Sequence, residues 1–260
     1  MSYYPILNAP QCKGWTTLCN FPPNNWEFFN NSKKYVNVTW ADGGSWHTHS
    51  IGTIANNEFR QVNIEEVEGY IPKSVLPLLS ITSSIMPKLS STLPESESWT
   101  EVPAWRATLG LSTDLSSTSY QGEIDPFPTP GSLLTFCPFL QFGKDISNFL
   151  IFMNIEKSPV VRKSYIEIYN PSNPEILLGK FKVNNNSATV INLDNLGFDQ
   201  KDLPLIICKN MSGIPLYLSK LNDGSFMSLE HTHPPASFVI HGNRWGAQKT
   251  LKSKWLSRVS

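Results

Sequence analysis

The sequence predicts an all-β fold, a β-sandwich or jelly-roll-like single domain over residues 1–260, with one short internal helix and a C-terminal helix. Short runs in which apolar and polar residues alternate are the first indication, since a period of two is typical of half-buried strands. Clusters of Asn, Ser, Gly and Pro between these runs are the second, because such clusters form turns. The third is composition: 16% of the residues are charged, below the usual quarter, while 40% are apolar.

The second half of the chain contains the clearest strands. Residues 164–169 alternate strictly, residues 170–174 read Asn-Pro-Ser-Asn-Pro, and alternation resumes within 176–183. This order of strand, turn and strand predicts a β-hairpin. By the same criteria we expect a further turn at 184–187. We also expect three further strands, at 148–155, 189–193 and 205–208.

The first half is less regular. Residues 35–40 alternate, Asp42-Gly43-Gly44 predicts a turn, and residues 46–54 are expected to form the returning strand. Residues 74–86 contain enough apolar residues for the short internal helix, with Pro87 ending it. Long irregular segments in a compact domain often have a function. Two such segments are expected here, 86–103 and 122–131.

The last residues of the chain are the best helix candidate. Ala247, Leu251 and Trp255 are spaced by four residues and would lie on one helical face. Basic residues surround them, and no acidic residue follows Glu230. This basic C-terminus, which includes Arg244, could bind phosphate, an acidic glycan or the acidic surface of a partner, or be an ordinary solvated helix.

Charge and hydropathy exclude several classes of partner and of location. The 21 basic and 21 acidic residues give a net charge of zero, so no overall field attracts nucleic acid. No segment approaches 18 consecutive apolar residues, and the N-terminus lacks a basic region followed by an apolar stretch. We therefore expect no nucleic-acid partner, no membrane span and a cytoplasmic location. Of the four cysteines, Cys137 and Cys208 lie in apolar runs and are expected to be buried thiols.

Four of the five histidines fall in two His-Thr-His tripeptides, His47 with His49 and His231 with His233. On a strand, residues two apart point to the same face, so each tripeptide could direct two imidazoles at one point. This resembles the way cupin-type β-barrel metalloenzymes present their ligands. The resemblance implies a divalent transition metal such as Zn²⁺, Fe²⁺, Cu²⁺ or Ni²⁺ at these four residues.

The chain departs from the cupin pattern in two places. Cupins carry a Glu about four residues after His-x-His, whereas here no acid precedes Glu58, and Pro234-Pro235 follows the second tripeptide. The alternative is that these histidines are half-buried strand residues that hydrogen-bond to neighbours or to a polar ligand. Asp-Gly turns at 42–43 and 223–224 precede the two tripeptides, which raises the alternative of two similar β halves, 30–140 and 145–260.

A second set of residues has side chains suited to sugars. Aromatic faces stack on sugar rings, and planar polar groups bind hydroxyl groups. Trp105 and Tyr120 supply the first kind of group, and Arg106 and Gln121 the second, while Glu123 and Asp125 are paired carboxylates on a proline-rich loop. An aromatic core beside a solvated loop is the other interpretation. Together with polar residues near the second tripeptide, the expected ligand-binding set is Trp105, Arg106, Tyr120, Gln121, Glu123, Glu230, His231, His233 and Arg244.

Two functions therefore follow from the sequence. The first is a carbohydrate-recognising binding or accessory protein in bacterial surface-polysaccharide or glycoconjugate metabolism, with a glycan or another polar small molecule as its ligand. The alternative is a metal-dependent, cupin-like β-barrel enzyme that uses the two tripeptides. The sequence contains neither the Gly-x-Ser-x-Gly of α/β-hydrolases nor a glycine-rich nucleotide-binding loop. Oligomeric state, and the choice between enzyme and binding protein, stay open.

Overall fold

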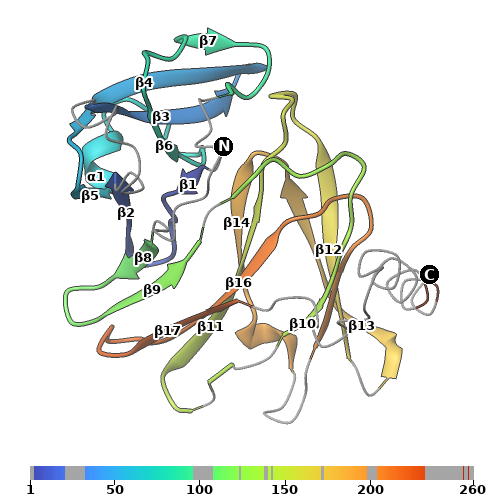
Figure 1. Ribbon diagram of the computed structural model, residues 1–260. Helices are drawn as coiled ribbons and strands as arrows, with labels where there is room; N and C mark the ends of the chain where they lie inside the picture. Colours follow the sequence, from blue (N-terminus) through green and yellow to red (C-terminus); the bar gives the residue numbers. More distant parts are fainter. Residues whose placement is uncertain are drawn as a thin grey trace, which may run out of the picture.

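The computed structural model describes residues 3–20, 33–95, 108–122, 124–137, 140–141, 143–170, 173–197, 204–231, 254 and 257. Within these residues the strands form four antiparallel sheets, which confirms the all-β prediction (Figure 1). Two sheets take their strands from the first half of the chain and two from the second half.

The first half forms a pair of facing sheets. One has the order β1-β6-β3-β4-β7 and the other the order β5-β2-β8-β9. Val36, Val38, Leu18 and Val62 belong to the apolar cluster between them. The strands are β1 (Tyr4–Pro5), β2 (Lys13–Asn20), β3 (Lys34–Asp42), β4 (Ser45–Ile54), β5 (Glu58–Asn63), β6 (Leu78–Thr82), β7 (Leu89–Ser90), β8 (Thr108–Ser112) and β9 (Ser117–Gln121).

The second half forms another pair, with the orders β10-β15-β12-β13 and β14-β11-β16-β17. Leu150, Ile166, Ile206 and Tyr217 belong to the cluster between these sheets. The strands are β10 (Leu133–Phe136), β11 (Ile146–Asn154), β12 (Lys163–Asn170), β13 (Asn173–Asn184), β14 (Ser187–Asn192), β15 (Leu205–Cys208), β16 (Ile214–Leu221) and β17 (Met227–His231).

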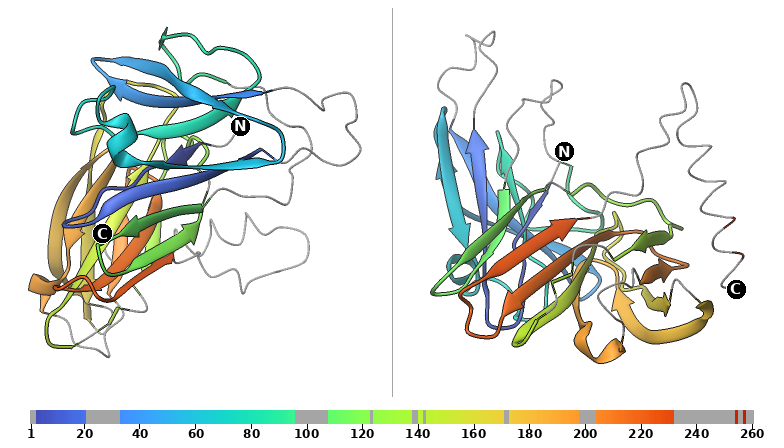
Figure 2. Two further views of the ribbon diagram at one scale, coloured as in Figure 1. Left: turned by 90° about the vertical axis from the view of Figure 1, so that its left-hand side faces the viewer. Right: turned by 90° about the horizontal axis from the view of Figure 1, so that it is seen from below.

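A third apolar cluster joins the two halves. Leu109 and Leu111 of β8 and Trp46 of β4 pack with Ile151 of β11 and Leu216 of β16 in this cluster. Strand β9 also lies beside β17 (Figures 1 and 2), where the Leu229 backbone nitrogen donates to Thr118 Oγ1 over 3.2 Å. The two halves of the chain thus share a buried face. That the chain is a single domain, and that it consists of two similar β halves at 30–140 and 145–260, both stay predictions.

The expected internal helix at 74–86 is wrong. Residues Leu78–Thr82 form strand β6, which pairs with β3 and β1 and is almost wholly buried. Ile81 and Thr82 are β-branched residues that favour strands, and the pairing with β3 and β1 outweighs the apolar content that predicted a helix. A single helical turn, α1 (Ile64–Val67), lies earlier in the chain and has a capping box between Asn63 and Glu66. A 3₁₀ turn, η2 (Asp194–Leu196), follows β14.

Several other predictions are confirmed. Strands β12 and β13 form the expected hairpin, with Ile166 opposite Phe181. The thiols of Cys137 and Cys208 are buried. The residues of the expected C-terminal helix, Ala247, Leu251 and Trp255, lie outside the described residues. In the described part of the chain, no helix is both long and apolar enough to cross a membrane.

Candidate functional site

Both histidine strands are the returning strands of hairpins that turn at glycine, as the sequence predicts for Asp42-Gly43-Gly44. Gly43 (φ +57°) and Gly44 (φ +80°) connect β3 to β4, and two successive positive φ values are typical of a tight hairpin turn. Gly224 (φ +76°) lies in the connection from β16 to β17. Glycine adopts this conformation without the steric conflict of a Cβ atom.

His47 and His49 lie on the same face of β4, but each contacts a different neighbour. The half-buried His47 ring stacks on Trp40 with 5.4 Å between ring centroids, and its Nε2 lies 3.2 Å from the Asp42 carbonyl oxygen. The exposed His49 ring stacks on Tyr70 at 4.2 Å. These contacts are those of strand residues packed on aromatic neighbours.

His231, at the end of β17, meets a residue from the predicted sugar-binding set. The Tyr120 hydroxyl lies 3.3 Å from His231 Nδ1, and the two ring centroids are 5.1 Å apart. Tyr120 is on β9, so the packing of β9 beside β17 brings these two predicted residues together.

The two tripeptides are held on different sheets. In Figure 1, β4 lies in the upper part of the view and β17 in the lower part, and their sheets belong to different halves of the chain. No group of three or more His, Cys, Asp or Glu suited to a metal occurs among the residues described. His233 lies outside them, so the four-histidine metal site stays a prediction.

The other predicted ligand residues are divided between described and undescribed parts. Gln121 is the last residue of β9. Glu230 is exposed, and its carboxylate accepts a hydrogen bond of 3.4 Å from Ser228. Because side chains alternate along a strand, Glu230 points away from the face that carries His231. The members outside the described residues are Trp105, Arg106, Glu123, His233 and Arg244.

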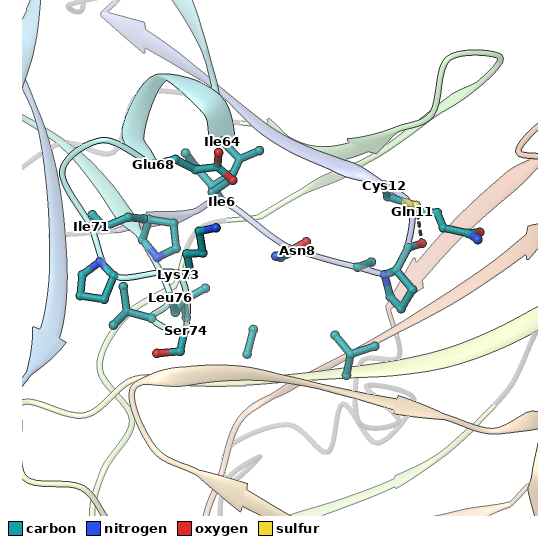
Figure 3. Close-up of a pocket in the computed structure, with 17 residues that line it drawn as sticks. Ile6, Asn8, Gln11, Cys12, Ile64, Glu68, Ile71, Lys73, Ser74 and Leu76 are labelled. Carbon is teal, nitrogen blue, oxygen red and sulfur yellow. Dashed lines mark hydrogen bonds between the residues drawn. The ribbon is translucent and has the colours of Figure 1, made fainter.

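A pocket of about 680 Å³ lies where the first half of the chain meets β14 (Figure 3). Its walls are the segment 6–12, the end of α1 with the segment 71–77, and Ala188 and Val190 of β14. In Figure 3, Asn8 points into the space between the segment that carries Gln11 and the segment that carries Lys73. The polar lining residues are Asn8, Gln11, Glu68, Lys73 and Ser74.

A second pocket of about 450 Å³ adjoins the first, because both are lined by Pro10, Gln11 and Val190. We call the two pockets together the seam groove. The rest of the second pocket comes from β14, β11, β16 and the residue after β16, namely Asn192, Ser147, Phe149, Lys220 and Asn222. The Ser147 hydroxyl donates to the Asn222 side-chain oxygen over 2.8 Å, which orients that amide.

Lys220 occupies a core position at the floor of this second pocket. Strand β16 alternates, so Leu216, Leu218 and Lys220 point to the same face, and Lys220 is 2% exposed. Its ammonium group donates to Gln11 Oε1 over 2.8 Å. None of the ion pairs among the described residues includes Lys220.

The chain turns tightly above Lys220. The Cys12 backbone nitrogen donates to the Ala9 carbonyl over 3.0 Å, and Gln11 within this turn has φ +61°. Cys12 Sγ lies 3.7 Å from Met227 Sδ, which places the turn against β17. Burial raises the pKa of the Cys12 thiol, and the positive charge of Lys220 offsets part of that rise.

Sequence reasoning missed the seam groove and Lys220. A signal existed in the run Leu216-Tyr-Leu218-Ser-Lys220, since a lysine that takes an apolar position in an alternating strand is either shielded or functional. No protein-family model matches the chain, and neither a curated protein nor a solved structure matches it. The function must therefore be argued from the groove itself.

Proposed function

We propose that the protein recognises a carbohydrate and binds it in the seam groove. The observation that carries the proposal is the groove's lining, in which amides, hydroxyl groups and charged groups face a space between aliphatic walls. Each of the two pockets falls in the range of roughly 300–1,000 Å³ that small-molecule sites occupy.

The lining suits the chemistry of sugar hydroxyl groups. A hydroxyl group both donates and accepts hydrogen bonds, and an amide side chain can satisfy both roles at once. Four amide residues line the groove: Asn8, Gln11, Asn192 and Asn222. The apolar C–H face of a sugar ring would pack against the partly exposed Ile71, Val75 and Val190.

The pair Tyr120–His231 is a separate place on the same sheet face. Leu216 lies opposite His231, and Lys220 follows Leu216 by four residues, so the two positions are about 13 Å apart along β16. Apolar residues, among them Leu218 and Leu229, fill the face between them. A ligand bound at Tyr120 and His231 would therefore not contact the amides of the seam groove. Mutations at the two places can distinguish these two binding sites.

Titration calorimetry against mono- and disaccharides tests the proposal. We expect Asn8→Ala to weaken sugar binding by about fivefold to tenfold, because one hydrogen bond contributes about 1 kcal/mol. Gln61→Ala, which removes an exposed amide of β5 outside the groove, is the matched control and should bind normally. Full binding by Asn8→Ala together with loss in Tyr120→Ala would place the ligand at β9 and β17 instead.

A cytoplasmic location and a role in surface-polysaccharide or glycoconjugate metabolism stay predictions. The metal-dependent alternative has a direct check, which is metal analysis of protein purified without a histidine tag. Less than half an equivalent of any transition metal would contradict it.

A further inference from the structure

We propose that the Lys220 end of the seam groove binds the anionic group of the ligand, so that the preferred ligand is an acidic saccharide carrying a carboxylate or a phosphate. This inference rests on the proposed carbohydrate function. It adds the charge that the ligand must carry and the residue that recognises it.

The first argument is the incomplete compensation of Lys220. An ammonium group has three N–H donors and is costly to bury unless it is paired. Lys220 is 2% exposed and donates to the neutral amide oxygen of Gln11. By contrast, the half-buried Arg162 is paired with the Glu156 carboxylate.

The second argument is the lining around that ammonium group. Among the residues that line the second pocket there is no Asp or Glu, while Ser147, Asn192 and Asn222 supply hydroxyl and amide groups. Glu68 lines the other pocket, toward α1. A carboxylate or phosphate in the second pocket would therefore meet one cation and several neutral polar groups, and no carboxylate among the residues that line it.

The third argument is the conformation of Gln11. Its φ of +61° is a left-handed conformation that glycine adopts freely and that a residue with a Cβ atom adopts at a cost. In this conformation the Gln11 side chain reaches Lys220 and also lines both pockets. The turn thus holds a neutral acceptor over the ammonium group, at the position where an anion would enter.

Binding is measured by calorimetry with four probes: glucuronic acid, glucose 1-phosphate, glucose and inorganic phosphate. We expect the wild-type protein to bind one or both acidic sugars at least tenfold more tightly than glucose, with an affinity that falls as salt rises. The two acidic probes distinguish a carboxylate from a phosphate as the preferred group.

Lys220→Met keeps most of the length of the side chain and removes its charge. The variant should lose at least tenfold in affinity for the acidic sugar and retain its affinity for glucose. Lys182→Met, which removes an exposed lysine of β13, is the matched control and should behave as the wild type.

Gln11→Glu is a second variant that keeps Lys220. Its carboxylate would pair with the ammonium group and occupy the place of the anion, so we expect the same selective loss of acidic-sugar binding. This variant tests the inference even where Lys220→Met folds poorly.

The outcomes separate the two proposals. Acidic sugars that bind both variants as tightly as the wild type would overturn the inference and leave carbohydrate recognition standing. A wild-type protein that binds inorganic phosphate through Lys220 but none of the sugars would overturn carbohydrate recognition, and with it the acidic saccharide. Binding of none of the four probes would overturn both.

Discussion

Two cationic side chains of the second half, Arg162 and Lys220, differ in their exposure and in their hydrogen-bond partners. Arg162 donates from Nε to the buried Glu156 carboxylate over 3.0 Å, and Asn185 Nδ2 donates to the same carboxylate over 3.1 Å. The hydrogen bond that Arg162 donates to Glu156 is the main cause of the raised pKa of Arg162. Lys220 is more deeply buried, yet its hydrogen bond goes to the neutral side chain of Gln11.

The surroundings of the two cations differ as well. Asn185 and Asn186 hold the loop between β11 and β12 through side-chain bonds to the backbone at Glu156, Ser158 and Arg162. Arg162 lines neither pocket of the seam groove, whereas Lys220 lines one of them. A charge whose partners are all internal acts on stability, whereas a buried charge that is incompletely paired at a pocket is a candidate for binding.

Arg162→Met should have the largest effect on stability. It leaves Glu156, whose side chain is 4% exposed, without its cationic partner, so we expect a loss of about 3 kcal/mol in the free energy of unfolding. Urea denaturation followed by tryptophan fluorescence measures it. Lys180→Met, which breaks a more exposed ion pair with Glu167, is the control and should lose much less. Equal losses of unfolding free energy in the two variants would contradict the expected difference between the Arg162–Glu156 and Lys180–Glu167 ion pairs.

Gln11→Glu should change stability in the opposite direction. The new carboxylate, on an exposed residue, would pair with the buried ammonium group of Lys220. A charged hydrogen bond contributes about 1 kcal/mol more than a neutral one. We therefore expect a higher midpoint of thermal unfolding in ligand-free protein. A lower midpoint would mean that Lys220 is already compensated in the wild type.

The sequence was most informative where a local pattern decided the structure. The alternation over 164–183 and the glycine turn at 43–44 predicted two hairpins, because strand pairing across a short turn is set by neighbouring residues. Strand β6 was missed because its pairing with β3 and β1 is a tertiary effect, which the β-branched residues Ile81 and Thr82 favour but do not specify.

The site was less predictable for the same reason. Tyr120 and His231 were both chosen from sequence, but they are 111 residues apart and meet because β9 packs beside β17. Gln11 and Lys220 are 209 residues apart, and no local pattern connects them. The groove exists because the turn at 9–12 lies over the face of a sheet formed by the second half.

Tyr120→Phe should have a smaller effect than either variant above. It removes the hydroxyl group that contacts His231 Nδ1 at 3.3 Å and keeps the ring that packs in the shared core, so the expected loss is about 0.5–1 kcal/mol. Urea denaturation measures it. Unchanged sugar affinity in this variant would support ligand binding in the seam groove. A tenfold loss of affinity would indicate that the ligand binds at β9 and β17 instead.

The smallest effect concerns pH. Burial by itself raises the pKa of Glu167, but hydrogen bonds from Lys180 and Tyr169 and the charge of Lys209 outweigh it and lower the pKa below its ordinary value. A lowered pKa stabilises the fold above the carboxyl's unfolded pKa, and this contribution is lost as pH falls through the lowered value. Glu167→Gln should therefore flatten the acid limb of the curve of stability against pH, which thermal unfolding between pH 2 and pH 6 would show. An unchanged acid limb would mean that other carboxylates control it.

The most direct test of the account is the free energy of unfolding of Lys220→Met, measured by urea denaturation in neutral buffer without phosphate or sugar. Replacing an incompletely paired buried cation by an apolar side chain of similar length removes a desolvation cost. The account predicts that the variant is as stable as the wild type or more stable. A loss in the free energy of unfolding as large as that of Arg162→Met would contradict it, because Lys220 would then stabilise the fold rather than serve to bind an anion.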